Sequence, residues 1–142
     1  MRRSQYVFGT ALAAAMAMGM AGFQGVHAQD QKEHVSKARV KSLAQVPLAG
    51  VEGKEVIIKH FAVPPGFVGG RHLHPGPVFV YVLEGELTVE TGGETLTFKA
   101  GELYPEATNS VMQGKNLSTT DDLEFVVFQV GDIGKPMMIK AE

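Results

Sequence analysis

Short runs of strand-forming residues, separated by glycine and proline turns, fill most of this sequence. Apolar residues alternate or cluster within these runs, and no apolar pattern has the 3.6-residue period of a helix. About eight short strands at regular spacing predict an all-β domain, either a small jelly roll or a closed barrel. The expected strands are Glu55–Val63, Val78–Leu83, Leu87–Thr91, Thr95–Lys99, Glu102–Tyr104, Ser110–Gln113, Leu123–Val130 and Met137–Lys140.

Two of these runs are apolar on both faces. In Val78–Leu83, three valines point to one side and larger apolar residues to the other, and Leu123–Val130 has a similar composition. Because side chains alternate along a strand, we expect both strands to be covered on both sides, as in a sandwich or barrel. The pair Gly92-Gly93 lies between two other runs and predicts a two-residue hairpin.

The first 28 residues predict a secretory signal peptide. Arg2 and Arg3 form a charged start, Val7–Phe23 is apolar and uncharged, and a small-residue cleavage site ending at Ala28 places the cut before Gln29. An N-terminal membrane anchor is the alternative, but an apolar run of about 17 residues is marginal for a span. The expected location is therefore the periplasm or the exterior of the cell.

Cleavage leaves a mature chain of about 114 residues, with a polar N-terminal arm and lead-in over 29–53 and a folded domain over 54–140. Ser42–Gly53 is expected as an edge strand or a lead-in. The mature chain loses two of the 13 basic residues and none of the 15 acidic ones, so its net charge is about −4. This charge argues against a nucleic-acid partner. We expect no membrane contact after cleavage. Because the sequence has no cysteine, disulfides and thiolate metal ligands are excluded.

The only His-x-His pair, His72 and His74, follows a glycine-rich turn at Gly66–Gly70. Residues two apart on a strand point to the same face, so the pair presents two imidazole nitrogens close together. Such a pair is the core of many sites for first-row transition metals, although two donors alone do not make a site. Burying both rings without a partner is costly, which favours a functional role over a packing role.

The sequence around this pair resembles the first motif of the small single-domain cupins. That motif runs glycine, five residues, His-x-His, three or four residues, glutamate, six residues, glycine. Gly66, His72, His74 and Gly85 stand at the matching positions, and Val78 stands where the glutamate is expected.

The second cupin motif has a turn glycine and, further on, a histidine shortly before an asparagine. Gly101 matches the turn, and the spacing back from Asn116 places Met112 at the histidine position. The resemblance covers roughly Val56–Val130. It implies a double-stranded β-helix, the cupin jelly-roll barrel, with an internal pocket, and it makes a homodimer plausible. It also implies a divalent metal held by two histidines, a glutamate and a later histidine.

Of these four ligand positions, His72 and His74 are kept, Val78 offers no donor and Met112 offers a thioether sulfur. Two imidazoles and one thioether carry no negative charge, so the set suits copper, above all Cu(I), better than a hard cation. We expect copper first, with iron, zinc or manganese as alternatives. Met112 is equally well explained as a core side chain. His60 is a further candidate ligand if its face of the strand looks into the barrel, although a lone histidine there is more often a core residue.

Three functions remain open on the sequence alone. The first is an exported cupin that binds a metal without turnover. The second is a cupin enzyme of the dioxygenase or isomerase type that acts on a small organic molecule. The third is a binding module that takes a small molecule and no metal. Arg71 either holds an anionic ligand at the pocket mouth or is a surface cation. No Ser-His-Asp order, nucleotide-binding loop or zinc-protease helix is present.

Overall fold

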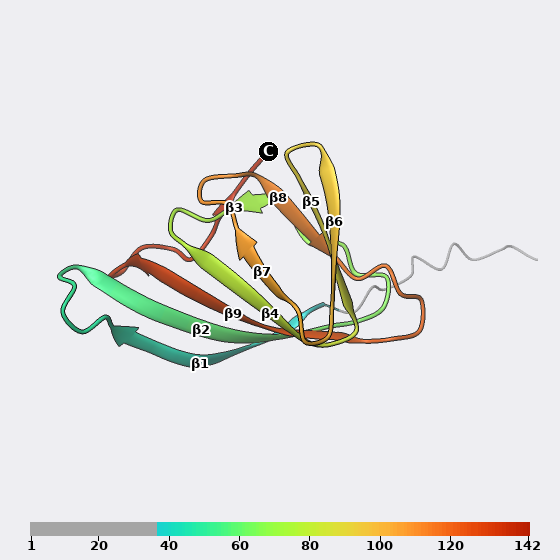
Figure 1. The fold of residues 1–142 in the computed structure, drawn as a ribbon, viewed down its shortest axis with the longest axis horizontal. Helices are drawn as coiled ribbons and strands as arrows, with labels where there is room; N and C mark the ends of the chain where they lie inside the picture. Colours follow the sequence, from blue (N-terminus) through green and yellow to red (C-terminus); the bar gives the residue numbers. More distant parts are fainter. Residues whose placement is uncertain (1–36) are drawn as a thin grey trace, which may run out of the picture. The chain divides into compact units, whose positions relative to one another are not determined.

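The computed structural model describes residues 37–142, which form ten β-strands and no helix (Figure 1). The expected signal peptide and residues 29–36 of the expected arm lie outside the described residues. No helix that could cross a membrane occurs within the described range. The strands are β1 Arg39–Pro47, β2 Lys54–Val63, β3 His72–Leu73, β4 Val78–Glu84, β5 Glu86–Thr91, β6 Glu94–Lys99, β7 Leu103–Glu106, β8 Met112–Lys115, β9 Leu123–Asp132 and β10 Ile139–Lys140.

The strands form two five-stranded antiparallel sheets. The first has the order β1-β2-β9-β4-β7 and the second the order β10-β3-β8-β5-β6. The late strand β9 lies between β2 and β4 and pairs with both, so the middle of the first sheet joins distant parts of the chain (Figure 1). Two packed antiparallel sheets with such crossovers are a jelly roll, which confirms the predicted all-β class.

All eight expected strands are present, with boundaries that shift by up to two residues. The shift that matters most is at β7, which we expected to end at Tyr104. Instead β7 continues through Pro105 to Glu106, and Pro105 pairs with Phe79 of β4. Proline is tolerated because β7 is an edge strand of the first sheet and needs no amide hydrogen on its open side.

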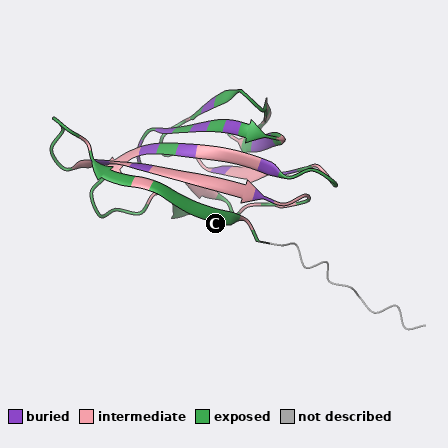
Figure 2. Cartoon of the chain, turned by 90° about the horizontal axis from the view of Figure 1, so that it is seen from below, coloured by how far each residue is buried: buried purple, intermediate pink, exposed green. Residues whose placement is uncertain are grey.

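The opposite edge of the first sheet is β1, which begins at Arg39 and pairs with β2 along its length. The segment expected as an edge strand or a lead-in is therefore an edge strand, and it starts a few residues earlier than Ser42. Almost every residue of β1 is exposed (Figure 2), since the strand has only one neighbour.

Two predicted turns depend on glycine. Gly92 and Gly93 join β5 to β6 with φ values of 55° and 84°, as a primed hairpin turn requires. Gly85 has a φ of 76°, and a Cβ there would lie 2.4 Å from the carbonyl oxygen of Asp122. This close approach explains why the turn after β4 takes a glycine.

The core lies between the sheets, and one face of β4 contributes three of its valines. Val78, Val80 and Val82 are at most 2% exposed, whereas Phe79 and Tyr81, which point outward, are 43% and 40% exposed. Figure 2 shows the same alternation of buried and exposed residues along β4. The expectation that β4 and β9 are covered on both faces is therefore wrong for this chain on its own: Phe128 of β9 is also 40% exposed.

Asn116 holds the loop that leads to the histidine pair. Its side chain is 1% exposed, and its amide Nδ2 lies within hydrogen-bonding distance of the carbonyl oxygens of Val63, Pro64 and Asp121. Its backbone amide donates to the carbonyl of Phe67. The asparagine of the second motif is thus a structural residue that ties the start of the glycine-rich turn to the end of β8.

Candidate functional site

A cavity of about 780 Å³ lies between the two sheets and receives the residues singled out in the sequence. Its walls are mainly apolar and come from both sheets, with Phe61 and Val80 on one side and Val89 on the other. His72, His74 and Met112 all line it. A mostly apolar cavity with a few polar groups at one end is the usual form of a small-molecule site.

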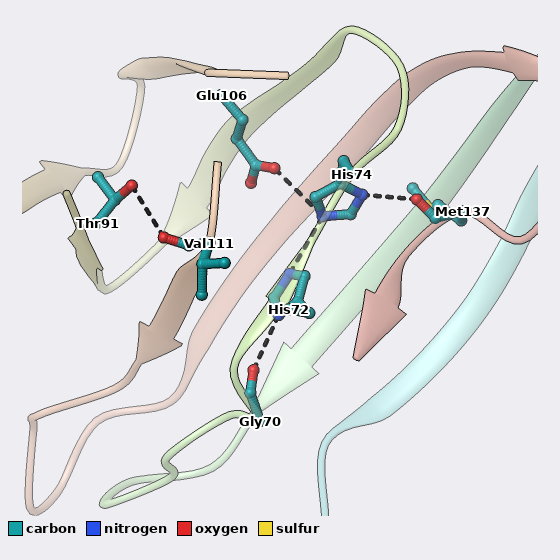
Figure 3. A network of polar contacts seen from close by, with 7 residues as sticks. All are labelled: Gly70, His72, His74, Thr91, Glu106, Val111 and Met137. Atoms are coloured by element: carbon teal, nitrogen blue, oxygen red, sulfur yellow. Dashed lines mark hydrogen bonds and ion pairs between the residues drawn. The ribbon is translucent and has the colours of Figure 1, made fainter. Parts of the chain in front are cut away.

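His72 and His74 meet inside this cavity through their Nε2 atoms, which are 3.1 Å apart (Figure 3). The two rings lie edge to face, with an interplanar angle of 84°. Each Nδ1 atom faces a backbone carbonyl: that of His72 lies 2.9 Å from the oxygen of Gly70, and that of His74 lies 2.7 Å from the oxygen of Met137. A carbonyl oxygen only accepts, so both Nδ1 atoms carry hydrogen and donate it.

This tautomer leaves a lone pair on each Nε2 atom when the rings are neutral. Two lone pairs facing each other at 3.1 Å repel, so the arrangement needs a proton or a cation between or beside them. Metal-binding histidines in proteins commonly donate the other ring nitrogen to a carbonyl or carboxylate in this way, which fixes the tautomer and the ring orientation. The pair is therefore oriented as metal-binding histidines are.

Glu106, at the end of β7, is the functional residue that the sequence analysis missed. Its Oε2 atom lies 3.2 Å from Nε2 of His74, and both side chains are 7% exposed (Figure 3). The geometry is not that of a hydrogen bond, and Oε2 is buried without a hydrogen-bond partner. A buried polar atom left without a partner is costly, which marks this oxygen as a donor available to a ligand.

Glu106 lies directly beside the valine that stands at the glutamate position of the first motif. Val78 pairs directly with Glu106 on one side and with Gln129 on the other, so the three side chains form one row on the inner face of the first sheet. A carboxylate thus lies one strand away from the position at which the first motif has its glutamate. Gln129 is 1% exposed, and its Oε1 atom also lacks a hydrogen-bond partner.

Burial controls the charge of this group. It raises the pKa of the Glu106 carboxyl from its ordinary value to about 7. It also lowers the pKa of His74, an effect that the hydrogen bond to Met137 opposes and the nearby His72 reinforces. Both shifts favour a neutral acid beside a neutral imidazole, so the contact between Glu106 and His74 is not a fully charged ion pair near neutral pH.

The described methionines all line the cavity: Met112, Met137 and Met138. Met112 is 6% exposed and pairs with His72 across β3 and β8, so the sulfur-bearing side chain that we expected near the pair enters the same cavity. His60 does not line it. Its neighbours Lys59 and Phe61 line the cavity, while His60 points to the other face of β2 and contacts Glu124 at 3.0 Å. The face of His60 does not look into the barrel, so His60 is removed from the candidate ligands.

Within residues 37–142, no three His, Asp or Glu side chains surround a common point as metal ligands do. His72 and Glu106 instead contact the same atom of His74. The donors nevertheless fit a transition metal by their chemistry, because two oriented imidazoles and one buried carboxylate oxygen are available side by side. Holding an ion requires the contacts to His74 to open.

One signal in the sequence pointed to Glu106. If the strand that begins near residue 103 is continued through Pro105, Glu106 falls on the same face as Tyr104, which is 6% exposed and packs against Phe98. The expected strand ended at Tyr104, before this proline, so the alternation that continues to Glu106 was missed.

Comparison with known proteins agrees with the fold. Residues 59–129 match the family model described as the cupin domain. No similar sequence is found among the curated proteins.

Solved structures with the same fold include a cupin 2 domain-containing protein from Halorhodospira halophila. It is 20% identical with a TM-score of 0.60, and the match covers 80% of this chain and 76% of that one. An RmlC-like cupin with a double-stranded β-helix from Methanocaldococcus jannaschii is 24% identical with a TM-score of 0.57, and the match covers 71% of this chain and 86% of that one. The DMSP lyase DddQ from Ruegeria pomeroyi is 13% identical with a TM-score of 0.60, and the match covers 78% of this chain and 54% of that one. At these identities the likeness shows the fold alone.

Proposed function

This chain belongs to the cupin family, and we propose that it binds a transition metal ion in its cavity through His72, His74 and Glu106. Cupin domains often bind transition metals. The observation that carries the proposal is the pair of Nε2 atoms 3.1 Å apart, with both Nδ1 atoms engaged by backbone carbonyls and a partnerless carboxylate oxygen beside them. Once the contacts to His74 open, a metal ion held by these three atoms would give each of them a partner.

Copper is the ion that we favour. Affinity of a nitrogen and oxygen site for divalent first-row metals is highest for copper, and a thioether sulfur adds a preference for Cu(I). Met112 is buried in the same cavity and paired with His72, which supports its role as a soft fourth ligand. Iron, zinc and manganese are the alternatives, since the carboxylate of Glu106 is a ligand that each of them accepts.

The experiment is elemental analysis of the mature chain purified without chelator or affinity tag. We expect about one metal ion per chain, and copper in excess over the other metals. His74→Ala is expected to remove the ion and Met112→Leu to lower the copper preference. Failure to bind any of the four metals after reconstitution would refute the proposal, and binding unchanged in Glu106→Gln would remove Glu106 from the ligands.

A second function, a metal-dependent enzyme of the dioxygenase or isomerase type, is favoured by the cavity itself. About 780 Å³ beside the histidines is large enough for a small organic substrate. When bound, the metal would supply Lewis-acid or redox chemistry. The chain's own residues would position the substrate: apolar walls exclude water, and Glu106 holds or accepts a proton near His74. If the cavity binds small molecules but no metal, the chain is a metal-free binding module instead.

We also propose that two copies of the chain pair through the outer face of the first sheet. The exposed apolar side chains of this face come from β4, β7 and β9 and are Phe79, Tyr81, Leu83, Leu103 and Phe128, each 40–53% exposed. Together they expose apolar area on the order of 400 Å², comparable to the apolar part of one side of a standard interface. Sedimentation analysis should show a dimer, and Phe79→Lys should produce a monomer that still binds metal. A wild-type monomer at micromolar concentration would refute this pairing.

The location that we propose is the periplasm or the exterior of the cell, on the strength of the N-terminal sequence. Mass spectrometry of the N-terminus after expression in a bacterial host tests it, because cleavage before Gln29 is expected and an intact N-terminus would contradict it.

A further inference from the structure

Positively charged residues outnumber negatively charged ones around the cavity. In the described part of the chain, four cationic residues line it, Lys59, Arg71, Lys115 and Lys140, whereas Glu106 is the one acidic residue of its lining. Lys115 is paired with Glu90. The other three cations form no ion pair with any carboxylate in the described part of the chain. The lining of this mainly apolar cavity therefore carries three positive charges that have no ion-pair partner among residues 37–142.

Lys59 is the informative member of this set. It stands on the inner face of β2, where it pairs with Val127 of β9, which in turn pairs with Val80 of β4. Its cross-strand partner on the other side is Ser42 of the edge strand β1. Phe61 and Val63 follow on the same face of β2 and also line the cavity. A half-buried lysine among such neighbours loses hydration unless an anion or water meets its ammonium group.

The other two cations belong to exposed residues of the cavity lining. Lys140 pairs with His72 across β10 and β3, so its side chain shares the face of the histidine, and Arg71 immediately precedes His72. Both are exposed, whereas the side chains of His74 and Glu106 are only 7% exposed. The cavity is therefore cationic towards solvent, apolar along its walls and polar at its inner end.

We propose that the cavity takes an organic anion with an apolar body, whose acid group is held by Lys59, Arg71 and Lys140. The apolar body lies between Phe61, Val80 and Val127 and points towards His74. This inference deepens the proposed function, since it names the ligand class of the same cavity, but its test does not depend on a bound metal.

Three probes of equal length separate charge from hydrophobicity: octanoate, 1-octanol and octylammonium. Their binding to the mature protein is measured by isothermal titration calorimetry. We expect octanoate to bind about tenfold more tightly than octanol, and octylammonium to bind most weakly, because only octanoate gains charge-assisted contacts. This preference should shrink as salt is raised, since the cations at the mouth are exposed.

Lys59→Met is the test variant, with Lys59→Arg as the conservative replacement. We expect Lys59→Met to lower octanoate affinity about tenfold and leave octanol affinity unchanged, and Lys59→Arg to keep the preference. Lys41→Met is the matched control, because Lys41 is exposed on the neighbouring β1 and does not line the cavity. Circular dichroism verifies that each variant is folded.

Two results would overturn the inference. Equal affinity for the three probes, or no binding of any, would show that the cations do not select a ligand. Octanoate binding that survives in Lys59→Met but is lost in His74→Ala would place the acid group at the histidines instead. A copper titration on the same samples separates this inference from the metal site: copper binding without octanoate preference refutes only the inference, and the reverse result refutes only the metal proposal.

Discussion

Two histidine–glutamate pairs of almost equal length lie on opposite faces of the first sheet. His60 and Glu124 are 3.0 Å apart with side chains 26% and 35% exposed, and His74 and Glu106 are 3.2 Å apart with side chains 7% exposed. Water solvates the outer pair, so it is an ordinary surface contact. At the inner pair, burial shifts both pKa values towards the neutral forms and leaves an oxygen without a partner. Burial, and not distance, makes one pair a candidate site.

The largest expected effect is on metal binding. His74→Ala should lower metal affinity by at least about 100-fold, because a direct ligand contributes more than the outer residues that orient it. His60→Ala should bind metal as the wild type does, since His60 does not line the cavity. Competition titration with a chromogenic chelator measures both. An equal loss of metal affinity in His74→Ala and His60→Ala would show that the inner and outer pairs do not differ in metal binding.

The second largest effect is expected on how the free energy of unfolding of the metal-free protein depends on pH. The pKa of Glu106 rises from 4.5 when unfolded to about 7 when folded, so between these values the folded chain keeps a proton that the unfolded chain has released. The free energy of unfolding should therefore fall as pH rises through this window, by about 3 kcal/mol in total.

Glu106→Gln should remove this contribution, because an amide does not ionise, while Glu124→Gln should retain it. Urea unfolding between pH 4 and pH 8 gives the difference between each variant and the wild type. His74 opposes the trend, because its lowered pKa makes protonation at acid pH destabilising, but it is present in all three proteins. If the free energy of unfolding changed with pH by the same amount in Glu106→Gln and in the wild type, the prediction would be contradicted.

A smaller effect concerns the choice of ion. Met112→Leu keeps the volume of the side chain, so stability should change by less than about 1.5 kcal/mol. If the thioether binds copper, the preference for Cu(I) over Zn²⁺ should drop by about tenfold. If the ratio of Cu(I) affinity to Zn²⁺ affinity were unchanged in Met112→Leu, Met112 would only fill the core.

The smallest effect is expected at the outer pair. His60→Gln should change the free energy of unfolding by no more than about 1 kcal/mol, as exposed pairs usually contribute little. Thermal unfolding at two salt concentrations measures it. A loss of several kcal/mol would mean that the outer face is covered in solution, as in the proposed dimer.

The local pattern of the sequence predicted the strands of this fold well, and one proline hid part of the site. The strands were predictable because period-2 alternation and glycine turns are local properties. Glu106 was not, since Pro105 signals a loop in isolation and is tolerated only because β7 is an edge strand. His60 was ambiguous for a similar reason: alternation tells which residues share a face, but not which face looks inward.

The sequence by itself determined the all-β class, the turns at Gly85 and Gly92-Gly93, and the pairing of His72 with His74 on one face. These depend on neighbours a few residues away. Only the tertiary structure decided that β7 lies beside β4, which brings Glu106 next to Val78 and into contact with His74, 32 positions earlier in the chain. Sheet register is set by the burial of whole faces, so the donor set of this cavity is a property of the folded chain.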